Sequence, residues 1–116
     1  MDGGQAGQAL TTLEAAGMSL RDPLGVQLAT LQARALEEQQ RTDEAEALYL
    51  RIADDAELAF QRVAALEDAA RLRMENSDFA GAAALYQRLI DGEEASIEQR
   101  AIYEMRLGEA MARQGG

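Results

Sequence analysis

The chain lacks two residue types that many active sites use. Its 116 residues include no cysteine and no histidine, and all 11 of its basic residues are arginine. Without histidine, the commonest general base and the commonest metal ligand are missing, and without cysteine there is no thiolate chemistry and no disulfide. We therefore expect a protein that is not an enzyme and that holds no cofactor and no metal.

Positive charge is also scarce. The chain has 11 basic and 21 acidic residues, which give a formal net charge of -10. A protein binds nucleic acids or anionic membranes through clustered positive charge of its own, so neither is an expected partner. No apolar run approaches the roughly 20 residues of a membrane-spanning helix, so we expect no direct membrane insertion within this chain.

Proline, β-branched and aromatic residues are few, whereas helix formers are abundant. There is one proline, Pro23, and five Phe and Tyr residues together, but alanine alone occurs 24 times. Alanine, leucine, glutamate, glutamine and arginine all have high helix propensity. The composition therefore predicts an all-α protein.

One short stretch occurs twice. "EALYLRIADD" from Glu46 returns as "AALYQRLIDG" from Ala83, so that Tyr49 and Tyr86 lie 37 residues apart. The apolar residues of each copy recur at i, i+3, i+4 and i+7, which is one face of a helix. We expect both tyrosines to pack in a core rather than to act in catalysis.

A longer amphipathic segment precedes or follows each copy, and cap residues separate the segments. Pro23 suits a first helical position after Asp22, and Ser96 with Gln99 forms a capping-box pattern. Other expected helix starts are Thr42, Asp54 or Asp55, and Ser77 or Asp78. The pattern predicts a flexible start over 1–7 and a helical repeat domain over 8–116, with two full hairpins at 23–53 and 56–91 and flanking helices at 8–17 and 96–114.

These residues resemble the tetratricopeptide repeat (TPR) family, whose units are helix–turn–helix hairpins of about 34 residues. The pattern of a small residue at the helix crossing, an early alanine in the second helix and an aromatic one turn later is matched by Ala33, Ala45 and Tyr49, and again by Ala70, Ala82 and Tyr86. Phe79 matches the aromatic residue of the turn, and Leu107, Gly108, Met111 and Gly115 match the first helix of a further repeat. The chain departs from the family in its longer period and in Gln40 and Ser77, which stand where a turn glycine is usual.

The resemblance implies a solenoid: a right-handed superhelical array of antiparallel helix hairpins that binds other proteins without catalysis. The alanine-rich units with lengthened first helices look most like the TPR-like domain of bacterial, inner-membrane-anchored periplasmic proteins that work beside the Sec translocon and its chaperones. This implies a scaffold or adaptor in an envelope or secretion-associated complex. It also implies a periplasmic location, tethered through an upstream segment; otherwise the chain would be cytoplasmic.

In the resembled family the first helices line a concave groove that holds a peptide or a partner's helix. Arg34, Arg71 and Arg113 recur at near-repeat spacing and could offer bidentate contacts to carboxylates. The alternative is that they pair with nearby glutamates on a solvated face. The candidate partner-binding residues are Gln27, Thr30, Arg34, Glu38, Glu67, Arg71, Glu75, Met105, Glu109 and Arg113.

Further alternatives concern the methionines, the acidic clusters and the role of the whole chain. Met74, Met105 and Met111 could form an adaptable binding surface, but we expect them to pack in the core. The acidic clusters at 54–57 and 91–94 lack the spacing of a calcium loop and suit helix starts instead. Exposed terminal helices could drive a homodimer, so the chain could be a self-associating structural subunit, or it could be a regulatory domain of a larger protein.

Overall fold

The computed structural model describes residues 17–115, and the regular secondary structure within that range is all α-helix. Five helices follow one another: α2 (Pro23–Glu38), α3 (Thr42–Asp55), α4 (Ala59–Glu75), α5 (Phe79–Asp91) and α6 (Ile97–Gly115). No strand occurs between residues 17 and 115. The all-α prediction is confirmed. The flexible start over 1–7 and the helix over 8–17 lie outside the described residues, apart from Gly17.

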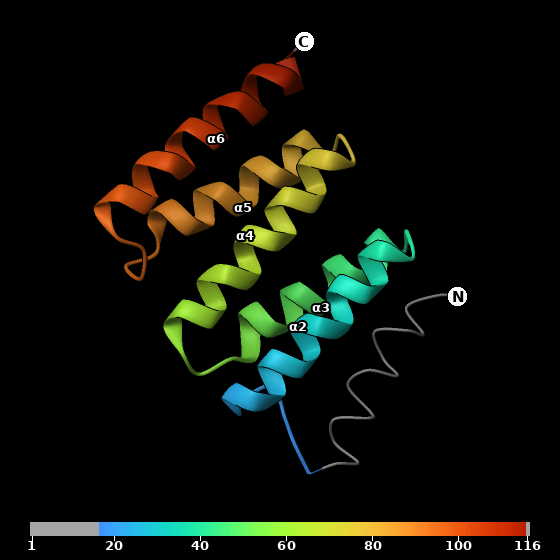
Figure 1. Cartoon of the computed structure of the whole chain (residues 1–116). Coiled ribbons are helices and arrows are strands. Elements are labelled where there is room, and N and C mark those ends of the chain that lie inside the picture. Colours follow the sequence, from blue (N-terminus) through green and yellow to red (C-terminus); the bar gives the residue numbers. More distant parts are fainter. Residues whose placement is uncertain (1–16, 116) are drawn as a thin grey trace.

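Each helix packs on the next one along the chain, and short turns make neighbours antiparallel (Figure 1). Hydrogen bonds also join each helix to the helix after next along the chain. Even-numbered helices therefore contact even-numbered ones, and α3 contacts α5. Gln61 of α4 donates to the carbonyl of Pro23 in α2, Tyr103 of α6 donates to Glu67 of α4, and Arg88 of α5 donates to Asp54 of α3. The sequence separations of these bonds are 38, 36 and 34 residues, close to the 37 residues that separate Tyr49 from Tyr86 in the repeated stretch.

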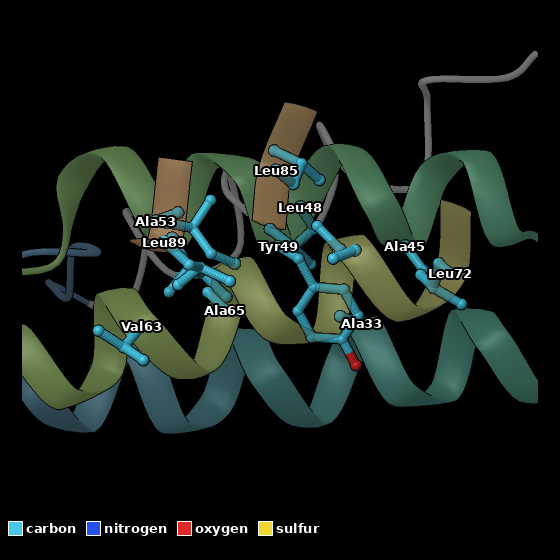
Figure 2. Packing of buried hydrophobic residues seen from close by; sticks show 14 of the residues in the cluster. Ala33, Ala45, Leu48, Tyr49, Ala53, Val63, Ala65, Leu72, Leu85 and Leu89 are labelled. Carbon is cyan, nitrogen blue, oxygen red and sulfur yellow. The ribbon is translucent and has the colours of Figure 1, made fainter. Parts of the chain in front are cut away.

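Small side chains let the helices approach closely where they cross. Ala33, Ala45, Ala69, Ala70 and Ala82 are all fully buried. Larger residues fill the space beside them, and Figure 2 shows the Tyr49 ring extending from α3 toward Ala33 of α2. Close packing of this kind leaves few voids in the core.

The repeated tyrosines lie in this core, as predicted. Tyr49 is 0% exposed and Tyr86 is 7% exposed. The Tyr86 ring stacks on Tyr103 of α6 with centroids 6.5 Å apart. The stretch that occurs twice in the sequence therefore supplies the buried apolar faces of α3 and α5.

Two of the predicted caps are present. Asp78 precedes α5 and its Oδ1 accepts from the backbone N–H of Gly81 at 3.0 Å. Before α6, the Ser96 N–H donates to Gln99 Oε1 at 2.8 Å and the Gln99 N–H donates to Ser96 Oγ at 3.1 Å. These reciprocal bonds are the capping box that the sequence predicted.

Two other cap predictions, at Thr42 and at Asp54 or Asp55, need correction, whereas the N-cap at Asp22 is confirmed. Thr42 is the first residue of α3 and the N-cap is Arg41, without a side-chain cap bond. Asp22 is the N-cap of α2, as expected, but its carboxylate accepts from Ser19 rather than from the helix. Helix α4 begins at Ala59, so Asp54 and Asp55 end α3 instead of starting the next helix. Ala56 is the C-cap of α3 and has an extended backbone with φ -63° and ψ 140°, and residues 56–58 form the turn into α4.

The turns inside both hairpins have the same geometry. Gln40 and Ser77 have positive φ values of 64° and 63°. After α2, the Arg41 N–H donates to the carbonyl of Leu36 at 2.8 Å and the Gln40 N–H donates to Glu37 at 2.9 Å. Asp78 and Ser77 repeat both bonds after α4. This is the Schellman motif, which favours glycine at the residue that Gln40 and Ser77 occupy.

Candidate partner-binding groove

An open groove of about 380 Å³ lies between α2 and α4. Three of the predicted binding residues, Gln27, Thr30 and Arg34, line it from α2. The sequence analysis missed its apolar walls, because the sequence does not show that Leu31 and Phe60 are exposed. Both side chains are exposed, to 60% and 69%. The remaining lining residues are Val26 of α2 and Gln61, Ala64, Ala65 and Asp68 of α4.

Gln61 lines the groove near the start of α4. This side chain is 8% exposed and is the one buried polar residue of the described core. Its Nε2 donates to the carbonyl of Pro23 at 3.3 Å, which ties the start of α4 to the start of α2. Its Oε1 is shielded from solvent, and no described protein group donates to it. An unpaired buried acceptor is uncommon in folded proteins.

Beyond the residues that line the groove, an ion cluster joins α2, α3 and α4. Arg71 of α4 donates to both carboxylate oxygens of Glu37 in α2, at 2.9 and 3.1 Å. Tyr49 of α3 donates its hydroxyl to the same carboxylate at 2.6 Å. Arg71 also contacts Asp68 and Glu75 of its own helix, at 3.4 and 3.2 Å. Glu37 is therefore the centre of a contact among three helices, and the sequence analysis did not single it out.

The ionisation of this cluster follows from its surroundings. Desolvation raises the pKa of Glu37, but the hydrogen bonds from Arg71 and Tyr49 and the positive charge of Arg71 outweigh it and lower the pKa overall. Burial raises the pKa of Tyr49 well above its ordinary range, and the bond to the Glu37 carboxylate raises it further. The bond to Glu37 also raises the pKa of Arg71. The cluster is thus held as an ion pair with a neutral tyrosine at neutral pH.

The three arginines that recur at near-repeat spacing have different environments. Arg71 is engaged by three carboxylates, as the alternative reading of a paired face expected. Arg113 lies 3.6 Å from Glu109 and its guanidinium carbon is 5.7 Å from the centre of the Phe79 ring. Arg34 forms none of the ion pairs found within residues 17–115. Of the three, Arg34 has the guanidinium that is best placed to meet a ligand in the groove.

The remaining predicted residues do not line the groove. Glu38 and Glu75 are exposed at the ends of α2 and α4. Glu67 accepts the hydroxyl of Tyr103, so it joins α4 to α6. Met105 and Glu109 lie on α6, where Met105 is 63% exposed.

The structure also places the three methionines and the acidic residues around the ends of α3 and α5 that the sequence analysis considered. Met74 packs against the core, whereas Met105 and Met111 are exposed on α6. Asp54 and Asp55 pair with Arg88 and Arg51 at 3.2 and 3.4 Å. Within the described range, no group of three or more potential ligand side chains is placed to hold a metal ion.

Comparisons with known proteins do not assign the chain to a family. No protein-family model, no curated protein and no solved structure matches the chain. Of the helices in residues 17–115, none combines the length and apolar character needed to cross a membrane.

Proposed function

We propose that the chain is a non-catalytic protein–protein interaction module that binds a peptide or a partner's helix in the groove between α2 and α4. The observation that carries the proposal is the groove itself, with the exposed Leu31 and Phe60 on its walls. Large apolar side chains that face solvent around a concavity are typical of binding sites. Ligand binding would remove their apolar surface from water, which is favourable.

The arrangement of the helices supports a TPR-like array. Hydrogen bonds join α2 to α4, α3 to α5 and α4 to α6, so successive hairpins stack in the way a helical solenoid requires. In this proposal α2, α4 and α6 line the inner face of a right-handed superhelix. The resemblance extends the proposal to a scaffold in a bacterial envelope or secretion-associated complex.

Selection of binding segments tests the proposal. A displayed library of random peptides is selected against the protein, and the dissociation constants of the recovered peptides are measured with the wild type and with Phe60→Ala. We expect Phe60→Ala to weaken binding at least tenfold, because a large aromatic contact is lost from the wall of the groove. Phe60 is mostly exposed, so the fold should be unaffected, which circular dichroism checks.

The matched control is Ile97→Ala. Ile97 is 84% exposed on α6, away from the groove, so this change also removes an exposed apolar side chain. Binding should be unchanged in this variant. Peptides that tolerate Phe60→Ala and are lost with Ile97→Ala would contradict the proposal. Arg71→Glu is a poor test, because it would break the contact between α2, α3 and α4.

A second candidate function is self-association through α6. Its exposed apolar residues are Ile97, Ile102, Met105 and Met111. Ala101 and Gly108 are exposed on the same helix, whereas Val63 and Ala70, which precede them by 38 residues in α4, are buried. Helix α6 therefore has an uncovered apolar face, and we propose that a second copy of the chain would cover it to form a homodimer.

Sedimentation over a range of concentrations tests self-association. Wild-type protein should increase in mass with concentration, and Met105→Glu should remain monomeric because it places a charge in the apolar face. Phe60→Ala serves as the control, since it leaves α6 intact and should associate like the wild type. A wild-type chain that remains monomeric at the highest concentration would exclude this candidate.

A further inference from the structure

We infer that the ligand of the groove is an extended apolar segment, four or five residues long, whose main-chain N–H donates to Oε1 of Gln61. This inference rests on the proposed function and specifies the conformation and chemistry of the partner. It follows from the length of the groove, from the unpaired oxygen of Gln61 and from the position of Arg34.

The groove is short. Its lining residues run from Val26 to Arg34 on α2 and from Phe60 to Asp68 on α4. Each run advances by eight residues, which corresponds to about 12 Å at 1.5 Å per residue. An extended chain rises about 3.3 Å per residue, so four or five residues fit along the groove.

Gln61 requires a donor that the protein does not supply. Its amide nitrogen is used by Pro23, while its amide oxygen is buried without a partner and belongs to a side chain that lines the groove. The last torsion of a glutamine is broad, so a small rotation can turn the oxygen toward a ligand. A ligand that donates a hydrogen bond there satisfies a group that is otherwise unpaired.

The donor distinguishes an extended segment from a helix. In the body of a helix every main-chain N–H is already bonded to a carbonyl four residues earlier. An extended segment keeps its N–H and C=O groups free. It can therefore donate to Gln61 and, farther along the groove, accept from Arg34, which lines the groove from α2.

Apolar side chains of the ligand would meet the walls. Side chains of an extended chain alternate between two sides, so every second residue points into the groove. Val26, Ala64 and Ala65 contribute smaller apolar side chains to the lining, while the larger Leu31 and Phe60 are exposed. Leucine, phenylalanine or methionine at alternate positions suits this surface.

The test uses a fluorescein-labelled library of acetylated, amidated pentapeptides with leucine, phenylalanine or methionine at the second and fourth positions. Binding is followed by fluorescence polarisation, and the site is mapped by amide chemical-shift changes in α2 and α4. The tightest peptide is then prepared with each main-chain nitrogen methylated in turn. We expect methylation at one position to weaken binding about tenfold, the usual effect of one lost hydrogen bond.

Gln61→Met connects that position to Gln61. Methionine keeps the length of the side chain but removes the acceptor, so the unmethylated peptide should bind about tenfold more weakly to this variant. The critical methylation should then cause no further loss. Gln32→Met is the matched control, because Gln32 also has a buried, unpaired amide oxygen but does not line the groove. It should leave the affinity and the methylation profile unchanged, and thermal unfolding verifies that both variants are folded.

The remaining outcomes separate this inference from the proposed function. Pentapeptides that bind in the groove with independent effects of methylation and Gln61→Met would overturn the inference and leave the interaction function standing. The same holds if only helical, hydrocarbon-stapled peptides of the same composition bind there. If neither kind of peptide shifts the amides of α2 and α4, both proposals fail.

Discussion

Arg71 of α4 holds Glu37 of α2 with two nitrogens, Nη2 at 2.9 Å from Oε2 and Nη1 at 3.1 Å from Oε1. The two residues lie 34 positions apart, so the pair joins the first helices of consecutive hairpins. Tyr49 of α3 donates to the same carboxylate from the core. The repeated tyrosine thus has a second role beyond packing, since its hydroxyl helps to fix the spacing of α2 and α4 and with it the width of the groove.

Glu37→Gln should lower the free energy of unfolding by about 1–2 kcal/mol. The amide keeps the shape of the side chain but removes the charge that attracts Arg71 and strengthens the bond from Tyr49. Urea unfolding followed by circular dichroism measures the change. Glu38→Gln is the control: the neighbouring glutamate is exposed, and its replacement should change the stability by less than about 0.5 kcal/mol. Equal effects of the two substitutions would show that the cluster does not stabilise the fold.

The same carboxylate should contribute to acid sensitivity. The pKa of Glu37 is lower in the folded chain than its ordinary value of 4.5, so its ionised form stabilises the fold. That contribution is complete above the unfolded-state pKa and is lost as the pH falls through the lower, folded-state pKa. Unfolding free energies measured from neutral pH downward should therefore fall more steeply for the wild type than for Glu37→Gln. Parallel curves would contradict the lowered pKa.

At alkaline pH the tyrosines should act in the opposite direction. Burial raises the pKa of Tyr49, Tyr86 and Tyr103, and carboxylate bonds raise those of Tyr49 and Tyr103 further. A raised folded-state pKa gives stability that is present below the ordinary value of 10.0 and is lost as the pH rises through the folded-state value. The native chain should therefore show little tyrosinate absorbance at about pH 10, until it unfolds. Tyr49→Phe should reduce the loss of stability above that pH, and free titration of all three tyrosines near pH 10 would refute the prediction.

The sequence predicted the helices and the buried stripes because these depend on local chemistry. Apolar spacing placed Tyr49 and Tyr86 in the core, and the Ser96–Gln99 capping box depends on residues three apart. It failed where the competing signals were equally local. Asp54 and Asp55 suit a helix start, but the apolar face of α3 continues through Ala53 and carries the helix past them.

The groove was only half predictable for a different reason. Spacing placed Gln27, Thr30 and Arg34 on one face of α2, and they line the groove together. Whether Arg71 is free depends on Glu37, 34 residues away, and no periodicity reports the direction of two long side chains. Phe60 and Leu31 were missed because exposed apolar residues are common and have no meaning until the neighbouring helix is placed beside them.

Glycine at the hairpin turns should stabilise the chain. Gln40 and Ser77 adopt left-handed φ angles of 64° and 63°, which cost about 1 kcal/mol for a residue with a side chain. Gln40→Gly and Ser77→Gly should each raise the free energy of unfolding by about 0.5–1 kcal/mol, measured by urea unfolding. Gln39→Gly is the control, because φ at Gln39 is -84° and glycine there only adds freedom to the unfolded chain. Stabilisation by Gln39→Gly as well would remove the backbone explanation.

Two glycines inside helices should respond to alanine in opposite ways. A Cβ built at Gly25 of α2 would lie 2.1 Å from the backbone oxygen of Ser19, which cannot move without shifting the turn before the helix. Gly25→Ala should therefore lower the free energy of unfolding by about 1–3 kcal/mol. At Gly108 of α6 an added Cβ meets nothing within 4 Å, so Gly108→Ala should raise it by about 1 kcal/mol through helix propensity alone. Thermal unfolding at low protein concentration, where any association through α6 is absent, measures both. Destabilisation by Gly108→Ala under those conditions would mean that α6 is packed more closely than its exposed face indicates.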